Sequence, residues 1–155
     1  VLHLIREGRD VMLSRLDGRM SRIDHPINRM MIFGDAEIES YLGVPLKNES
    51  VAEIRNEIEM QHWVTAVGFG LRGRKYPNRY LEVRYEDICN DPVKSLEEIF
   101  SFIEVRFTDK TKTWIDQTAY AGRIGKWKSY NGELSRATEI GRPLLTKLGY
   151  LPETS

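Results

Sequence analysis

An arginine and a serine eight residues apart stand where a short apolar run gives way to an amphipathic one. Arg6 follows the run 1–5, and Ser14 lies within the segment 9–16. A guanidinium at a strand end offers a forked set of donors to phosphate oxygens, and a nearby hydroxyl adds another donor. Because ligands of parallel α/β sheets bind beyond the carboxyl ends of the strands, the pair indicates an anion site. The same pattern is also typical of a strand-to-helix turn that carries solvated arginines.

Two acids follow a second β-rich run, residues 80–85. Glu86 and Asp87 are adjacent carboxylates, a pair that could do acid/base chemistry. Neighbouring side chains at a strand end point apart, however, and acids there usually hold turns or cap helices. We therefore favour a structural role for both residues.

A third candidate segment is a glycine-containing turn near the end of the chain. Gly122 and Gly125 alternate with the cations Arg123 and Lys126, and Ile124 lies between them. Glycines permit tight turns and a close approach of the backbone, and the interleaved cations favour an anion. Taken alone, the segment is equally typical of a glycine turn with a surface lysine.

Together, in this order and spacing, the three segments resemble the sulfotransferases that use PAPS (3′-phosphoadenosine 5′-phosphosulfate). In that family an arginine at a strand end and a serine eight residues later hold the 3′-phosphate, and these would be Arg6 and Ser14. The tyrosine of the family's Tyr-Glu-Asp-Leu/Ile segment lines the adenine site. That role would fall to Tyr85, since an aromatic ring can pack on a purine.

The late segment resembles the family's Gly-x-x-Gly-x-Trp loop, which folds over the 3′-phosphate. The resemblance therefore implies that the loop binds the nucleotide through Gly122, Arg123, Ile124, Gly125 and Lys126. Cytosolic members carry an Arg-Lys pair before the first glycine, where this chain has Tyr120 and Ala121. Arg123 is the candidate for the missing cation, as in heparan-type and many bacterial members.

The resemblance implies an α/β fold of the P-loop nucleotide-kinase-like, three-layer sulfotransferase type, N-terminally incomplete, with residues 1–155 as the C-terminal part of a single sulfotransferase domain. It implies transfer of the sulfuryl group of PAPS to a hydroxyl or amine acceptor that the sequence does not specify.

The family's 5′-phosphosulfate loop and general base have no counterpart here. We therefore expect the isolated chain to be inactive and name no catalytic residue, taking His3, His25 and His62 as packed or surface residues. The alternative is a non-catalytic nucleotide-binding or interaction fragment derived from a sulfotransferase. A kinase-like nucleotide binder is less favoured, because no phosphate loop is present.

Composition excludes several classes of protein. The 23 basic and 23 acidic residues give a formal net charge of zero, which argues against a nucleic-acid binder. The single cysteine, Cys89, permits no intrachain disulfide and favours a reducing, cytoplasmic location. No apolar run reaches the roughly 18 residues that a membrane span requires. No Cys/His spacing indicates a metal site.

The element pattern is that of an α/β protein. We expect a buried strand over residues 1–5, an amphipathic helix of about two to three turns among residues 9–17, mostly loop over 18–33 and a short helix over 35–42. A longer helix should begin at a Ser50–Glu53 capping box and end near Gly73 and Pro77. A strand over 80–85 and a helix with Asp91 as its N-cap follow.

We expect residues 133–148 to form two short helices or one broken helix, because Pro143 would cost about 3 kcal/mol inside a helix. Gly149 should then cap its C-terminus. Because the chain begins directly on a strand, we expect a portion upstream of Val1. If these residues are instead complete, the unpaired strand edges predict a homodimer or higher oligomer.

Overall fold

The computed structural model describes residues 1–16, 40, 43, 54–118, 124–130 and 132–153. They form two compact units. The first comprises Val1–Arg6 and Val67–Ile124, and the second comprises Glu7–Ala66 and Gly125–Ser155. Helix α4 (Arg55–Leu71) contributes residues 67–71 to the first unit and residues 55–66 to the second. Among the described residues, no helix has the length and apolar character needed to cross a membrane.

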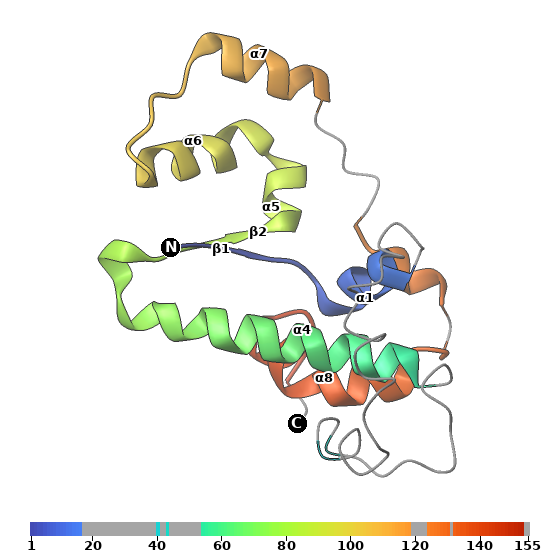
Figure 1. The fold of residues 1–155 in the computed structure, drawn as a ribbon. Coiled ribbons are helices and arrows are strands. Elements are labelled where there is room, and N and C mark those ends of the chain that lie inside the picture. The colour runs from blue at the N-terminus through green and yellow to red at the C-terminus, as the bar shows by residue number, and fades with distance from the viewer. Residues whose placement is uncertain (17–39, 41–42, 44–53, 119–123, 131, 154–155) are drawn as a thin grey trace, which may run out of the picture. The chain divides into compact units, whose positions relative to one another are not determined.

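A two-stranded parallel sheet lies at the centre of the first unit. Strands β1 (Leu2–Ile5) and β2 (Leu81–Arg84) run side by side, with Leu2 opposite Leu81 and Ile5 opposite Arg84 (Figure 1). Both strands were expected, and their parallel pairing confirms the α/β class. The expectation of a fully buried first strand is wrong for these residues: Ile5 is buried, but Leu2 and Leu4 are 44% and 53% exposed.

Short-range signals set the helices around this sheet. Helix α4 ends at Leu71, and the 3₁₀ turns η1 (Arg72–Lys75) and η2 (Pro77–Arg79) follow, as the glycine and proline in them predict. After β2 come α5 (Tyr85–Asn90) and α6 (Pro92–Phe102). The predicted cap of α6 is confirmed, because the side chain of Asp91 accepts a hydrogen bond from the backbone N–H of Lys94 at 3.2 Å.

Helix α7 (Asp109–Thr118) was not predicted from the sequence. Thr108 precedes it, and its hydroxyl oxygen accepts a hydrogen bond from the backbone N–H of Thr111 at 3.2 Å. Ile115 is buried, whereas the neighbouring Trp114 is 63% exposed. The signal that could have found this helix is therefore the threonine cap, since only one apolar side chain of the helix is buried.

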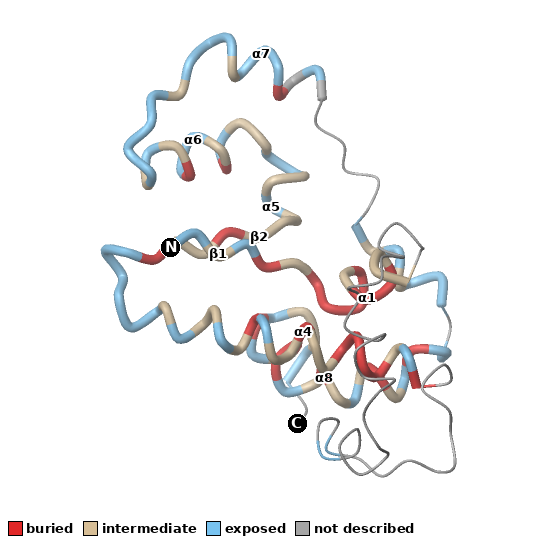
Figure 2. Tube along the Cα trace, in the orientation of Figure 1, coloured by how far each residue is buried: buried red, intermediate tan, exposed pale blue. Residues whose placement is uncertain are grey.

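The second unit is a helical core. It consists of α1 (Gly8–Leu16), residues 55–66 of α4, the 3₁₀ turn η3 (Lys126–Ser129) and α8 (Ser135–Lys147). Figure 2 shows buried residues gathered along α1, along this part of α4 and along α8. Close packing is visible at Gly8, where a Cβ atom would lie 2.7 Å from the ring of Trp63.

Helix α8 corrects the expectation of a break at Pro143. The helix is continuous from Ser135 to Lys147 with Pro143 inside it. Because proline has no backbone N–H, the carbonyl of Glu139 loses its helical hydrogen-bond donor. Both residues lie on the exposed side of the helix, where water can donate to that carbonyl instead. The opposite side buries Ala137, Gly141, Leu144 and Leu145, and this burial outweighs the lost hydrogen bond.

The predicted glycine cap of α8 is confirmed. Gly149 adopts a φ of 75°, and the backbone N–H of Tyr150 donates to the carbonyl of Leu145 at 2.8 Å. The predictions for residues 18–33 and for the Ser50–Glu53 capping box, and almost all of the helix predicted over 35–42, lie outside the described residues.

Candidate functional site

The first unit brings together two of the predicted ligand residues. Arg6 follows β1 directly and Tyr85 follows β2 directly, and the last residues of these strands, Ile5 and Arg84, are partners in the parallel register. Both side chains therefore stand at the carboxyl ends of neighbouring parallel strands. The guanidinium carbon of Arg6 lies 4.6 Å from the centroid of the Tyr85 ring. This stacked pair combines a forked cation with an aromatic ring at the edge where α/β sheets bind ligands.

The first turn of α1, in the second unit, is unusually rich in buried charge. Glu7, Arg9 and Asp10 are 6%, 4% and 0% exposed. One carboxylate oxygen of Glu7 accepts a hydrogen bond from Nε of Arg9 at 2.6 Å, and the other accepts from the backbone N–H of Asp10 at 2.9 Å. Glu7 thus caps the helix and pairs with Arg9. Burial nevertheless raises the pKa of Glu7, although the hydrogen bond from Arg9 acts in the opposite direction.

Asp10 ties this turn to the late glycine segment. Its carboxylate accepts hydrogen bonds from the backbone N–H of Gly125 at 2.6 Å and from that of Trp127 at 3.1 Å. The guanidinium carbon of Arg9 lies 3.4 Å from the centroid of the Trp127 ring. Gly125 has a φ of 75°, a conformation that favours glycine. Two adjacent residues of α1 therefore hold η3 by its backbone and by its aromatic ring.

The remaining predicted residues are distributed as follows. Ser14 lies half-buried on α1, Lys126 begins η3 and is exposed, and Ile124 is 36% exposed in the first unit. Gly122 and Arg123 lie outside the described residues. Sequence reasoning gave no role to Asp10 or to the stacking of Arg9 on Trp127. Only the adjacency of a basic and an acidic residue at the helix start could have signalled them.

The predicted acid pair lies in a helix rather than at a strand end. Glu86 and Asp87 are in the first turn of α5, which begins at Tyr85. Negative charge in a first turn is favourable to a helix because of its dipole. Among the described residues, no three His, Cys, Asp or Glu side chains are grouped so that they could hold a metal ion.

A second polar cluster in the first unit surrounds His3. Its Nδ1 lies 2.6 Å from the hydroxyl of Tyr80, which donates to Glu82 at 3.1 Å, and Arg74 donates two hydrogen bonds to the same carboxylate at 2.6 and 2.8 Å. Arg74 holds the pKa of Glu82 below its usual value. Burial lowers the pKa of His3, and burial together with Glu82 raises the pKa of Tyr80 to about 12. The cluster links the two strands to η1, which agrees with the interpretation of His3 as a packed residue.

Comparison with known proteins identifies the chain. The model of the sulfotransferase domain matches residues 1–124, which include Arg6, Ser14 and Tyr85. The chain belongs to the sulfotransferase family. This confirms the resemblance on which the site was predicted, and sulfuryl transfer is the general activity of such a domain. Neither a curated protein nor a solved structure matches the chain. The anchor formed by Asp10 with Gly125 and Trp127 joins the matched region of this sulfotransferase chain to residues beyond it.

Proposed function

We propose that this sulfotransferase chain uses PAPS and moves its sulfuryl group to a hydroxyl or amine acceptor. In this proposal residues 1–155 are the C-terminal part of one sulfotransferase domain with a P-loop nucleotide-kinase-like, three-layer fold. The chain contributes the 3′-phosphate and adenine sites. Family membership supports the general activity, and the nucleotide sites rest on the matched motifs.

One observation carries the proposal. Arg6 and Tyr85, which the family motifs assign separately to the 3′-phosphate and to adenine, are stacked at 4.6 Å at the carboxyl ends of β1 and β2. They are 79 positions apart in the sequence, and two independent motifs would not be expected to converge on one strand edge by chance. A phosphate and a purine on the same nucleoside require ligands that are near one another, and this pair would provide them.

The side chains fit the two groups chemically. The guanidinium of Arg6 can donate a pair of parallel hydrogen bonds to phosphate oxygens, and the hydroxyl of Ser14 adds a donor. The stacked guanidinium covers one face of the Tyr85 ring. We therefore propose that the purine contacts the other face or the hydroxyl edge of Tyr85.

The glycine loop completes the proposed phosphate site. Gly122, Arg123, Ile124, Gly125 and Lys126 would surround the 3′-phosphate with backbone N–H groups and cations. The hydrogen bonds from Gly125 and Trp127 to Asp10 support this, because they fix the second half of the loop to the helix that carries Ser14. PAPS would supply the activated sulfuryl group. The residues of this chain would contribute by binding and orienting the nucleotide, the positioning effect that dominates such transfers.

Calorimetry with two nucleotides tests the phosphate assignment. Adenosine 3′,5′-bisphosphate should bind more tightly than adenosine 5′-monophosphate by about 1.5–3 kcal/mol, the value of hydrogen bonds to a charged group. Replacing Arg6 with alanine should remove most of this difference, and Arg6→Lys should restore it only in part because the fork is lost. Arg106→Ala, an exposed arginine of the same unit, is the matched control and should leave the difference unchanged. Equal affinities for the two nucleotides in the unaltered chain would refute the 3′-phosphate assignment.

A turnover assay tests which part of the chemistry this chain carries. The sequence has no counterpart of the family's 5′-phosphosulfate loop or of its general base. Residues 1–155 alone should therefore transfer sulfate from PAPS only at the background rate. Clear turnover by these residues would show that the chemistry lies within them.

A further inference from the structure

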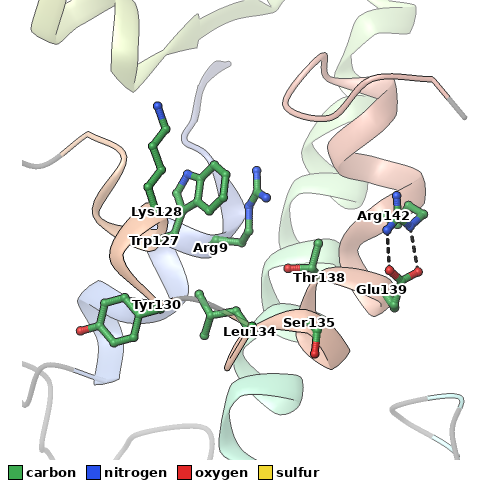
Figure 3. A pocket seen from close by; sticks show the side chains of 10 residues that line it. Arg9, Trp127, Lys128, Tyr130, Leu134, Ser135, Thr138, Glu139 and Arg142 are labelled. Carbon is green, nitrogen blue, oxygen red and sulfur yellow. Dashed lines mark hydrogen bonds and ion pairs between the residues drawn. The ribbon is translucent and has the colours of Figure 1, made fainter.

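The second unit contains an open pocket that the proposed nucleotide site does not use. It has a volume of about 340 Å³ and lies between η3 and α8 (Figure 3). Its lining includes Arg9, Trp127, Lys128, Leu134, Thr138 and Arg142. None of these is among the residues predicted to bind the nucleotide. The pocket therefore requires a separate explanation.

Arg9 supplies a buried, oriented cation to this pocket. Its side chain is only 5% exposed, its Nε donates to Glu7 at 2.6 Å and one terminal nitrogen, Nη2, donates to the carbonyl of Tyr150 at 3.4 Å. The other terminal nitrogen, Nη1, makes no hydrogen bond with a described residue. Stacking on Trp127 at 3.4 Å fixes the plane of the guanidinium. Arg9 thus presents a donor that is held in place and still has bonding capacity.

The other walls add positive charge and a hydroxyl. Figure 3 shows Thr138, Glu139 and Arg142 on α8 across the pocket from Arg9, with the hydroxyl of Thr138 directed toward the space between. Arg142 is engaged by Glu139 through two hydrogen bonds. Lys128 is exposed and forms no ion pair with a described residue. The lining thus holds three cations and one carboxylate; Glu7 pairs with Arg9 and Glu139 with Arg142, which leaves Lys128 as the cation without an ion pair among the described residues.

We propose that this pocket binds a small organic oxyanion, a phosphate or sulfate monoester on a single-ring or short-chain body. The oxyanion contacts Arg9 and Thr138, and its apolar body lies against Leu134 and Trp127. The volume of about 340 Å³ is near the lower end of the range for small-molecule sites, which suits a ligand of this size. The inference uses a different set of residues from the proposed nucleotide site and does not depend on it.

Tryptophan NMR signals provide the readout. The chain has three tryptophans, so a ¹H–¹⁵N spectrum of the full 155 residues should contain three indole signals. Trp127→Phe identifies the signal of the residue in the pocket. Titration with phenyl phosphate and phenyl sulfate should move this signal, whereas Trp114, on α7 of the first unit, should not respond. Benzamide, a neutral molecule of similar shape, should leave all three signals in place.

Two substitutions on α8 should change the affinity in opposite directions. Thr138→Val removes one hydroxyl at nearly constant volume and should weaken binding of phenyl phosphate by about two- to tenfold. Glu139→Gln removes the carboxylate that engages Arg142 and should strengthen binding by about two- to fivefold, the range expected for an exposed charge pair. A gain in affinity cannot come from misfolding. Thr146→Val on the same helix and Glu98→Gln on α6 are the matched controls, and neither should change the affinity.

Competition separates this pocket from the nucleotide site. Saturating adenosine 3′,5′-bisphosphate should leave the affinity for phenyl phosphate unchanged. Displacement of phenyl phosphate by this nucleotide would overturn the proposal, because the probe would then occupy the nucleotide site. An equal response to benzamide, or unchanged affinities in both α8 variants, would also overturn it.

Discussion

Asp10 is the residue whose replacement most directly tests how the late glycine loop is held. Its side chain is completely buried, and its two carboxylate oxygens accept hydrogen bonds from the backbone of Gly125 at 2.6 Å and of Trp127 at 3.1 Å. Asp10→Asn keeps the size of the side chain but leaves only one acceptor oxygen. The new amide group must then face a backbone N–H, and one of the two hydrogen bonds is lost.

The expected loss of stability follows from these contacts. A hydrogen bond to a charged group contributes about 1.5–3 kcal/mol net, and a buried donor without a partner costs about 1–3 kcal/mol. Because these contributions overlap, we expect Asp10→Asn to lower the free energy of unfolding by about 2–4 kcal/mol. This is a large share of the 5–15 kcal/mol that is typical of folded proteins.

Urea unfolding of the unaltered chain and of Asp10→Asn measures this loss of free energy of unfolding. The midpoint should fall for Asp10→Asn with little change in slope. Asp87→Asn, at an exposed acid in the first turn of α5, is the matched control and should cost less than about 1 kcal/mol. Under conditions in which Asp10→Asn is folded, the preference for adenosine 3′,5′-bisphosphate over the monophosphate should also shrink. If Asp10→Asn had the same stability and the same nucleotide preference as the unaltered chain, the anchoring role of Asp10 would be wrong.

Two further predictions concern Tyr80 and Pro143. Because burial and Glu82 raise the pKa of Tyr80 to about 12, the unfolded chain loses this proton before the folded chain does, so stability should fall as the pH rises from about 10 to 12. Tyr80→Phe should reduce this fall, which urea unfolding at pH 9 and pH 11 measures. If the free energy of unfolding fell equally between these pH values in the unaltered chain and in Tyr80→Phe, the raised pKa of Tyr80 would be contradicted. Pro143→Ala should raise the free energy of unfolding by about 1–2 kcal/mol, because it restores a donor for the carbonyl of Glu139 in a helix that is already continuous. Thermal unfolding measures this change, and a lower melting temperature for Pro143→Ala would contradict the cost assigned to the lost hydrogen bond.

Sequence signals of short range predicted most of the described elements. The apolar run of β1, the alternating run of β2, the Asp91–Pro92 start of α6 and the Gly149 cap each depend on residues that are close together in the sequence. Such signals fail where tertiary packing outweighs them. Pro143 lies inside α8 because the opposite side of that helix is buried. Helix α7 was missed because only one of its apolar residues is buried, so its sequence has no clear apolar pattern.

Sequence motifs named two residues that the structure brings into contact, but they did not name the residues that hold the late glycine loop. Family motifs named Arg6 and Tyr85, and the structure places these two side chains in contact. No local pattern could show that Asp10 accepts hydrogen bonds from a segment more than a hundred residues away, because that contact depends on the packing of η3 against α1. The pairing of His3 with Tyr80 is likewise set by the register of two distant strands.

The buried charges on α1 stabilise the loop only as a group. Glu7 caps the helix and orients Arg9, Arg9 stacks on Trp127, and Asp10 holds the backbone of η3. Each charge is costly to bury alone, and removal of one partner leaves another uncompensated. Burial raises the pKa of Glu7 despite its hydrogen bond with Arg9, as this cost predicts for a buried carboxylate. The conformation of Gly125 and η3 is therefore determined at the start of α1 as much as by Gly125 itself. Substitutions at Glu7, Arg9 and Asp10 should accordingly be non-additive in their effects on stability.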